Sequence, residues 1–299
     1  MPIEPRLSAR DFDPEVMRLF DQYVHGRIDR RGFLEGAARH APIGVTAAML
    51  LEALNPRFAE AQQVKPDDAR LVARFVEIDS PAGYGKVRGY LVKRKDAAGK
   101  LPGVLVVHEN RGLNPHIEDV TRRVALENFV AFAPDALFPL GGYPGDEDKA
   151  RAAFAKLDQV KTREDFAAAA EWLRALGDVG PRVGVVGFCY GGAMSNLLAV
   201  RLPWLAAAVP FYGGSQPTAD AAKIKAALMI HNAEKDDWVN TGAAAYEQAL
   251  KAAGVRLQAF SYPGTQHGFN NDTTPRYDEP AARLAWQRTV AFFNAQLRT

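Results

Sequence analysis

The only cysteine of this chain stands in a pattern that restricts how the backbone around it can fold. Cys189 lies between Gly187 and Gly191, after the apolar run 183–186 and before a helix-like stretch that begins at Gly192. Glycines suit a strained turn on both sides of the cysteine, because a Cβ atom there would clash with neighbouring backbone. The helix that follows would direct its N-terminal amides toward the thiol. The segment therefore predicts a strand, a sharp turn that carries a candidate nucleophile, and a helix; the alternative is a buried structural thiol.

From about residue 70 the sequence alternates between strand-like and helix-like segments. The predicted strands span residues 71–78, 87–92, 103–108, 129–133, 182–188, 206–211, 227–231 and 257–262. The predicted helices span residues 115–127, 148–157, 164–176, 241–253 and 280–297. This alternation predicts an α/β fold, a doubly wound and mostly parallel sheet flanked by helices, with ligands at the carboxyl ends of the strands. In that context the turn resembles the G-x-S-x-G nucleophile elbow of the α/β-hydrolase fold, with cysteine in place of serine.

Two strand ends carry residues that could serve this thiol. The strand 227–231 is followed by Asp236 and Asp237, and the next strand is followed by His267. In α/β-hydrolases the acid and the histidine follow the nucleophile in this order, each just past a strand. His267 is therefore the predicted base for Cys189, and Asp236 rather than Asp237 is the predicted carboxylate that sets its tautomer.

The strand that ends at residue 108 is followed by Glu109, Asn110 and Arg111. The backbone amides of Asn110 and Tyr190 are the predicted oxyanion hole. A carboxylate beside a thiolate raises the thiol pKa, so Glu109 is expected to keep Cys189 protonated at rest and to accept its proton when substrate arrives. The alternative for this carboxylate is an ordinary loop ion pair between Glu109 and Arg111.

Taken together, these motifs resemble the dienelactone hydrolase family of α/β-hydrolases over about residues 70–297. The matching segments are His108-Glu109 with Gly112-Leu-Asn, Ala133-Pro-Asp135, Gly187-Phe-Cys189-Tyr-Gly-Gly, Asp236-Asp-Trp-Val and Gly264-Thr-Gln-His267-Gly-Phe. The resemblance implies cleavage of a small ester or lactone through Cys189, His267 and Asp236, with an acyl-cysteine intermediate and with Glu109 activating the thiol. It implies no metal and no organic cofactor.

The chain departs from this family pattern in the substrate pocket. The best-known members place a serine directly after the histidine and an arginine four residues after it, where this chain has Gly268 and Asn271. Arg151 is an unaligned counterpart of a second family arginine, and Tyr143 and Trp238 are predicted to contact substrate. An ester or lactone without a carboxylate therefore fits as well as dienelactone does.

Composition restricts the other function classes. The chain has 299 residues and is 47% apolar, enough for one full core with an appendage. The 37 basic and 35 acidic residues leave no nucleic-acid footprint, and one cysteine excludes internal disulfides and a Cys-rich zinc site. No apolar run approaches the roughly 18 residues that span a membrane. The expected partner is a small-molecule substrate, and the sequence leaves open whether the chain forms a homodimer. The alternative functions are a non-catalytic binding or redox-sensing protein on this scaffold, and a thioesterase or peptidase.

Residues 1–65 differ in kind from the predicted catalytic domain, residues 66–299. A helical period in residues 14–24 predicts a helical N-terminal extension packed on the domain, which implies a cytoplasmic protein. The rival interpretation is a twin-arginine export signal with periplasmic location. Its elements are Arg30-Arg31, Phe33, Leu34 and the cleavage-site pattern Ala59-Glu-Ala61.

Overall fold

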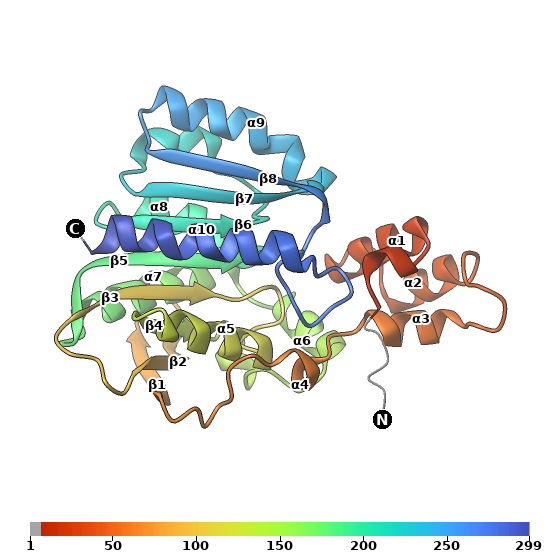
Figure 1. Ribbon diagram of the computed structural model, residues 1–299, viewed down its shortest axis with the longest axis horizontal. Helices are drawn as coiled ribbons and strands as arrows, with labels where there is room; N and C mark the ends of the chain where they lie inside the picture. The colour runs from red at the N-terminus through yellow and green to blue at the C-terminus, as the bar shows by residue number, and fades with distance from the viewer. Residues whose placement is uncertain (1–6, 299) are drawn as a thin grey trace.

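The computed structural model describes residues 7–298, and its centre is an eight-stranded sheet with helices on both faces (Figure 1). The strands are β1 (Leu71–Ser80), β2 (Gly85–Arg94), β3 (Leu101–Val107), β4 (Val130–Pro134), β5 (Val179–Phe188), β6 (Ala207–Phe211), β7 (Ala227–Lys235) and β8 (Leu257–Gln266). Their order is β1-β2-β4-β3-β5-β6-β7-β8. Only β2 runs antiparallel to its neighbours, so the predicted doubly wound, mostly parallel sheet is confirmed.

Successive side chains along each central strand point to opposite faces of the sheet, because strand side chains alternate with period two. The flanking helices are α5 (Pro115–Leu126), α6 (Glu147–Phe154), α7 (Gln159–Ala175), α8 (Tyr190–Arg201), α9 (Asp237–Ala252) and α10 (Glu279–Leu297). Val104 and Val106 belong to the apolar cluster beneath α5 and α10. Leu105 and Val107 belong to the cluster beneath α7 and α8. Burial on both faces explains why β3 reads as one continuous apolar run.

The N-terminal extension is helical and has an apolar cluster of its own. It comprises α1 (Pro14–Val24), α2 (Arg30–Ala37), α3 (Ala47–Leu54) and the short α4 (Phe58–Ala61). The first three begin at side-chain caps, Asp13, Asp29 and Thr46. Buried members of its cluster are Phe12, Val16, Met17, Phe20, Tyr23, Phe33, Ala37, Ala47, Leu50, Leu51 and Leu54. The arginine pair and the cleavage-site pattern thus lie in α2 and α4, and the question of export stays a prediction.

The extension lies beyond the carboxyl ends of the parallel strands, where Figure 1 shows α1, α2 and α3. Its linker is fixed by Asp119 of α5, whose carboxylate accepts hydrogen bonds from the amides of Gln63 at 3.0 Å and Val64 at 2.8 Å. Arg122 donates to the Val64 carbonyl at 2.8 Å, and the Gln63 side chain donates to Asp272 at 2.7 Å. No helix among residues 7–298 has both the length and the apolar character needed to cross a membrane.

Strand β7 runs further than its apolar run predicts. The prediction ends at His231, whereas pairing with β8 continues to Lys235, opposite Gln266, after a register shift at Ala233. The longer strand ends immediately before Asp236, so this aspartate lies at the carboxyl edge of the sheet.

Candidate active site

The turn around Cys189 has the strained geometry that its glycines predict. Cys189 connects β5 to α8 with φ 55° and ψ −111°, and positive φ is rare for residues other than glycine. A Cβ atom on Gly187 would lie 2.0 Å from the carbonyl oxygen of Gly191, and one on Gly191 would lie 2.2 Å from that of Val107. Glycine at both positions therefore lets strand and helix approach closely enough to present the thiol at the sheet edge.

His267 and Asp236 meet at the same edge. Nδ1 of His267 lies 2.6 Å from Oδ2 of Asp236, and both side chains are buried. The other carboxylate oxygen caps α9 by accepting the amide of Val239 at 3.3 Å, which fixes the orientation of the carboxylate. Asp237 is exposed. The contact thus agrees with the choice of Asp236 over Asp237, while the catalytic roles of these residues stay predictions.

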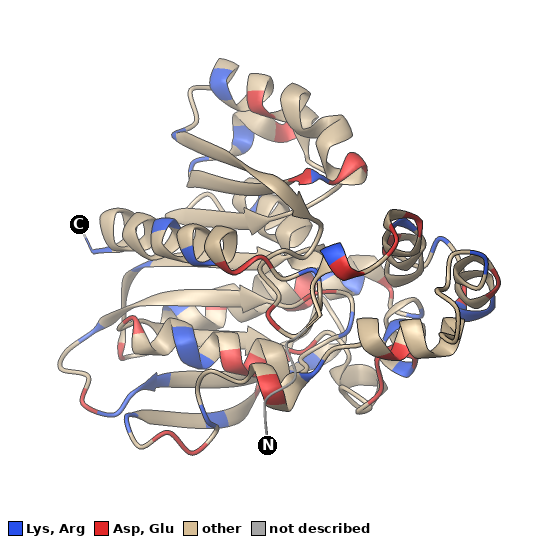
Figure 2. Cartoon of the chain, turned by 45° about the vertical axis from the view of Figure 1, so that its right-hand side comes forward, with Lys and Arg blue, Asp and Glu red and all other residues tan. Residues whose placement is uncertain are grey.

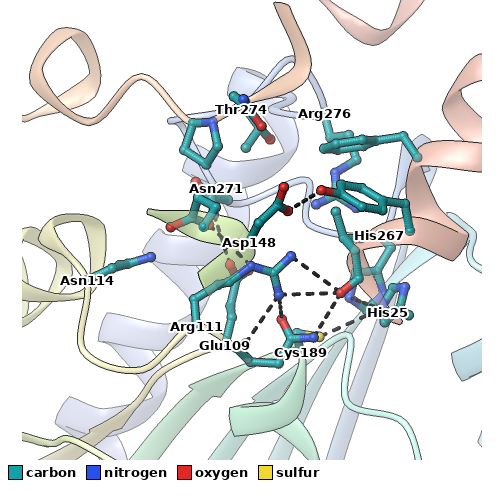
Figure 3. Close-up of a pocket in the computed structure, with 17 residues that line it drawn as sticks. His25, Glu109, Arg111, Asn114, Asp148, Cys189, His267, Asn271, Thr274 and Arg276 are labelled. Carbon is teal, nitrogen blue, oxygen red and sulfur yellow. Dashed lines mark hydrogen bonds and ion pairs between the residues drawn. The ribbon is translucent and has the colours of Figure 1, made fainter. Parts of the chain in front are cut away.

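A second histidine, which no motif identifies, reaches this cluster from the extension. His25 follows the last residue of α1, and its Nε2 lies 3.2 Å from Nε2 of His267 and 3.8 Å from Sγ of Cys189 (Figure 3). Its Nδ1 lies 2.8 Å from the carbonyl oxygen of Asp21. The only sequence signal for this residue is its place at the end of the predicted helix, which says nothing about where the helix docks.

Three side chains of the hydrolase domain hold the segment before His25. The carbonyl oxygen of Val24 accepts hydrogen bonds from the Asn110 side chain at 2.9 Å and from Arg111 at 3.4 Å. The carbonyl oxygen of Tyr23 accepts one from Arg151, whose guanidinium also stacks on the Tyr23 ring at 3.8 Å from its centroid. Arg151, predicted to contact substrate, therefore binds the extension, although it also borders the cavity described below.

Glu109 lies in the site but is not paired with Arg111. Its Oε2 accepts a hydrogen bond from the side chain of Asn271 at 3.1 Å. Arg111 instead lies 3.4 Å from Oε2 of Glu147, so the loop ion pair considered for Glu109 is not the arrangement found. Asn271, at the position where the best-known family members have an arginine, thus contacts the Glu109 carboxylate directly.

The protonation expected for Cys189 is wrong. Burial raises the pKa of the thiol, but the charge on His267 and hydrogen bonds with His25 and His267 outweigh burial and lower it to about 6. Glu109 does not dominate, because two imidazoles contact the sulfur while its own carboxylate is engaged by Asn271. At neutral pH the cysteine is therefore a thiolate rather than a protected thiol.

Both histidines favour their protonated forms. Burial lowers the pKa of His267, yet the Cys189 charge and the hydrogen bond to Asp236 raise it to about 10. Burial likewise opposes protonation of His25, yet hydrogen bonds with Asp21 and Cys189 raise its pKa to about 9. The cluster is thus a thiolate beside positive charge, the state in which cysteine is most nucleophilic.

Two cavities meet at this cluster, and His25, Asn110, Cys189 and His267 line both. The larger, about 460 Å³, is bordered by Arg151, Phe154, Gln159, Tyr190, Tyr212, Ser215 and Trp238. The smaller, about 40 Å³, lies beneath the extension and is bordered by Glu109, Arg111, Glu147, Asp148, Asn271 and Arg276. His25 therefore borders both the larger cavity and the smaller, polar one.

The predicted pocket residues divide accordingly. Trp238 borders the larger cavity, and Tyr190 begins α8, where its amide lies at the helix N-terminus. Tyr143 borders neither cavity, because its hydroxyl donates to Glu147 at 2.9 Å and its ring packs on Phe58, so its contact with substrate stays a prediction. A potential metal-ligand set is also present among the described residues, formed by His25, Cys189 and His267.

This sheet order, with a nucleophile elbow after β5 and further polar residues after β7 and β8, defines an α/β-hydrolase. The model of the dienelactone hydrolase family matches residues 87–297, and the chain belongs to that family. A second model, described as YqhI-like, matches residues 4–40 and thus much of the extension.

Individual relatives agree with this assignment. "Putative carboxymethylenebutenolidase" of Escherichia coli (strain K12) is 32% identical over 243 residues, 76% of this chain and 88% of its own. "Putative hydrolase fragment YghX" of the same strain is 52% identical over 114 residues, 38% of this chain and 97% of its own. A solved structure named a putative dienelactone hydrolase, from Klebsiella pneumoniae, has a TM-score of 0.66 at 29% identity and covers 74% of this chain and 98% of its own. The chain is accordingly a dienelactone hydrolase-like hydrolase.

Proposed function

We propose that this hydrolase cleaves small esters or lactones through a covalent acyl-Cys189 intermediate. The observation that carries the proposal is the strained elbow thiol, with its lowered pKa, beside a histidine that Asp236 orients at 2.6 Å. A nucleophile, a base and a group that orients the base are the parts that covalent catalysis needs.

In the first half of the reaction, the Cys189 thiolate attacks the substrate carbonyl and forms a carbon–sulfur bond. The backbone amides of Asn110 and Tyr190 would stabilise the oxyanion, since the second stands at the N-terminus of α8. The carbon–oxygen bond then breaks, and His267 gives its Nε2 proton to the leaving alcohol or enolate. Asp236 keeps the imidazolium in place during this transfer.

In the second half, His267 accepts a proton from water, and the hydroxide attacks the thioester. The carbon–sulfur bond breaks, the acid leaves, and the thiolate is regenerated. For a lactone the leaving oxygen stays tethered to the acyl group, so only one product forms. Thiolates suit such activated substrates, whereas amides with basic leaving groups are poor ones.

The larger cavity favours a substrate without a required carboxylate. Its volume of about 460 Å³ is that of a small-molecule site, and Phe154, Tyr190 and Trp238 give it apolar walls. Its arginine, Arg151, is already engaged by the extension through the Tyr23 carbonyl. The substrate class proposed is therefore a neutral, activated ester or lactone.

The test is a panel of p-nitrophenyl esters, unsaturated lactones, thioesters and peptides, with intact-mass analysis of the quenched enzyme. We expect turnover of esters or lactones and an acyl adduct on Cys189, with neither in Cys189→Ala. Turnover of thioesters or peptides alone would favour the thioesterase or peptidase alternative. Absence of both turnover and adduct would favour a binding or redox-sensing role.

A further inference from the structure

The three nitrogen and sulfur atoms at the centre of the site converge on one point. Nε2 of His25 lies 3.8 Å from Sγ of Cys189 and 3.2 Å from Nε2 of His267, and the donor atoms of the three residues all lie within 4.8 Å of one another. Figure 3 shows His25 and His267 side by side above the sulfur. The triad chemistry uses only one of these imidazoles, so the second needs its own explanation.

The hydrogen-bond partners of the rings decide where their protons lie. Nδ1 of His267 faces the Asp236 carboxylate at 2.6 Å. Nδ1 of His25 faces two acceptors of Asp21, the carbonyl oxygen at 2.8 Å and Oδ1 at 3.3 Å. Because Nδ1 of each ring faces an acceptor, the hydrogen of each neutral ring lies on Nδ1 and leaves a lone pair on Nε2. The two Nε2 lone pairs then point at one another across 3.2 Å. Two facing lone pairs repel at this distance, and so do the two N–H groups of the protonated rings, whereas a cation bound to both lone pairs removes the repulsion.

The spacing of the donors matches a tetrahedral metal centre. Zinc binds imidazole nitrogen at about 2.0–2.1 Å and thiolate sulfur at about 2.3 Å, which separates two nitrogens by about 3.3 Å and sulfur from nitrogen by about 3.6 Å. From Nε2 of His25 the corresponding distances are 3.2 Å to the other nitrogen and 3.8 Å to sulfur, and all three donor atoms lie within 4.8 Å of one another. Zinc-bound histidines usually donate their other N–H to a carboxylate or carbonyl, as both of these do.

We propose that His25, Cys189 and His267 form a binding site for Zn²⁺, in which the fourth position opens to the larger cavity. Binding forms one zinc–sulfur and two zinc–nitrogen bonds, and the Nε2 protons of the two imidazolium rings pass to solvent. The metal is not a cofactor of the hydrolase, because it occupies the thiolate that would attack the substrate. Zinc therefore inhibits the enzyme reversibly; this inhibition rests on the proposed function, whereas the binding does not.

The first experiment titrates the full-length, chelator-stripped chain with Zn²⁺ against a chromogenic chelator. We expect one tightly bound Zn²⁺ per chain. Removing a ligand costs at least the roughly ten- to hundredfold in affinity that is typical of losing an outer partner, so His25→Gln should bind at least that much more weakly. The matched control is His40→Gln, because His40 lies elsewhere in the extension, with its Nδ1 3.8 Å from Asp13. This variant should bind like the unaltered chain.

Spectroscopy with Co²⁺ in place of zinc tests the ligands without reference to activity. We expect a thiolate-to-cobalt charge-transfer band, its loss in Cys189→Ala, and weaker tetrahedral d–d absorption in His25→Gln. Asp21→Asn leaves all three ligands in place and removes the carboxylate behind His25, which also faces Arg276 at 3.7 Å, so it should weaken binding less than His25→Gln does. Circular dichroism and thermal melts establish that each variant is folded.

Three results would overturn the site. If His25→Gln binds zinc as tightly as the unaltered chain, the metal is held by an ordinary Cys–His pair and the extension contributes nothing. If binding does not saturate near one equivalent, there is no specific site. Zinc binding in a protein that hydrolyses no ester would refute the proposed function alone. Ester turnover through Cys189 that zinc leaves unaffected would refute the metal site alone.

Discussion

Two Asp–His pairs meet at Cys189, and they come from different regions of the molecule. His267 and Asp236 follow neighbouring parallel strands, β8 and β7, so the sheet itself holds them together. Asp21 lies in the last turn of α1 and His25 directly follows the helix, and both reach the site only because the extension docks there. In Figure 2 the helices of the extension and the domain edge beside them both carry acidic and basic residues. The sheet thus fixes the positions of His267 and Asp236, whereas the position of His25 relative to Cys189 depends on docking of the extension.

The largest effect on ester hydrolysis is expected for Cys189, the residue at which the two Asp–His pairs meet. Replacing Cys189 with Ala removes the covalent intermediate, and no neighbouring residue can replace it. Ester hydrolysis should fall by about a thousandfold or more, as for removal of other triad members. Initial rates with a p-nitrophenyl ester measure this, and an unchanged thermal melt shows that the fold survives. Activity within tenfold of the unaltered enzyme would remove Cys189 from the mechanism.

Matched Asp→Asn changes compare the two pairs directly. Asp236→Asn should lower kcat/KM by roughly a hundredfold or more, because asparagine favours the wrong tautomer of His267. Asparagine caps helices as well as aspartate does, so α9 should stay intact. Asp21→Asn should cost far less, and Asp237→Asn, at an exposed position, close to nothing. A larger loss from Asp21→Asn than from Asp236→Asn would reverse the roles given to the two regions.

The pH dependence of thiol reactivity tests the charges that the pairs supply. Cys189 has a pKa of about 6, lowered from 9.0, so the thiolate is present above pH 6 and is protonated as the pH falls below it. The rate of alkylation by iodoacetamide, measured with a chelator present, should therefore reach half its maximum near pH 6. His25→Gln removes one contact to the sulfur and should move this midpoint upward. A midpoint near 9 in the unaltered chain would contradict the thiolate assignment.

A substitution that destabilises the extension should increase local unfolding there more than it does in the hydrolase domain. Phe33 is fully buried in the apolar cluster of the extension, and a Phe→Ala change at such a site costs about 3–5 kcal/mol. Hydrogen exchange should then accelerate in α1 to α3, with little change in β3 to β8. Ester hydrolysis should change only a few-fold, since the sheet-borne residues stay in place. Equal acceleration in both regions would mean that they unfold as one unit.

The prediction with the smallest expected effect concerns whether the N-terminal extension is cleaved in the cell. We propose that the extension is retained and the protein is cytoplasmic, because α1 to α3 pack around one apolar cluster and contact the active site. N-terminal sequencing of the protein from cytoplasmic and periplasmic fractions tests this. A periplasmic product that begins near Gln62 would contradict it, and such a product would lack both Asp21 and His25.

The sheet-borne half of the site was predictable because local patterns determine it. The glycines beside Cys189 require the elbow, and two apolar strands of a parallel sheet bring Asp236 and His267 to one edge. His25 was not predictable, since the helical period of α1 fixes which residues are buried but not the surface they meet. The protonation of Cys189 differed from the prediction because the charge on His267, together with a hydrogen bond with His25 that only docking supplies, lowers the thiol pKa. The position of Tyr143 outside both cavities was not predictable either, since it depends on its contacts with Glu147 and Phe58.

The docking contacts also determine the order in which the molecule can be completed during synthesis. Asp21 faces Arg276 at 3.7 Å, the Arg57 amide donates to the Thr273 carbonyl at 2.8 Å, and the Gln63 side chain binds Asp272. The extension is thus made first, and the loop that receives it is made almost last. The 209 positions from Gln63 to Asp272 take about 10–40 s at roughly 5–20 residues per second. During that interval α1 can meet Asn110, Arg111 and Arg151, but not the later residues Asp272, Thr273 and Arg276. Complete docking of the extension over the thiol therefore waits until residues 272–276 have been synthesised.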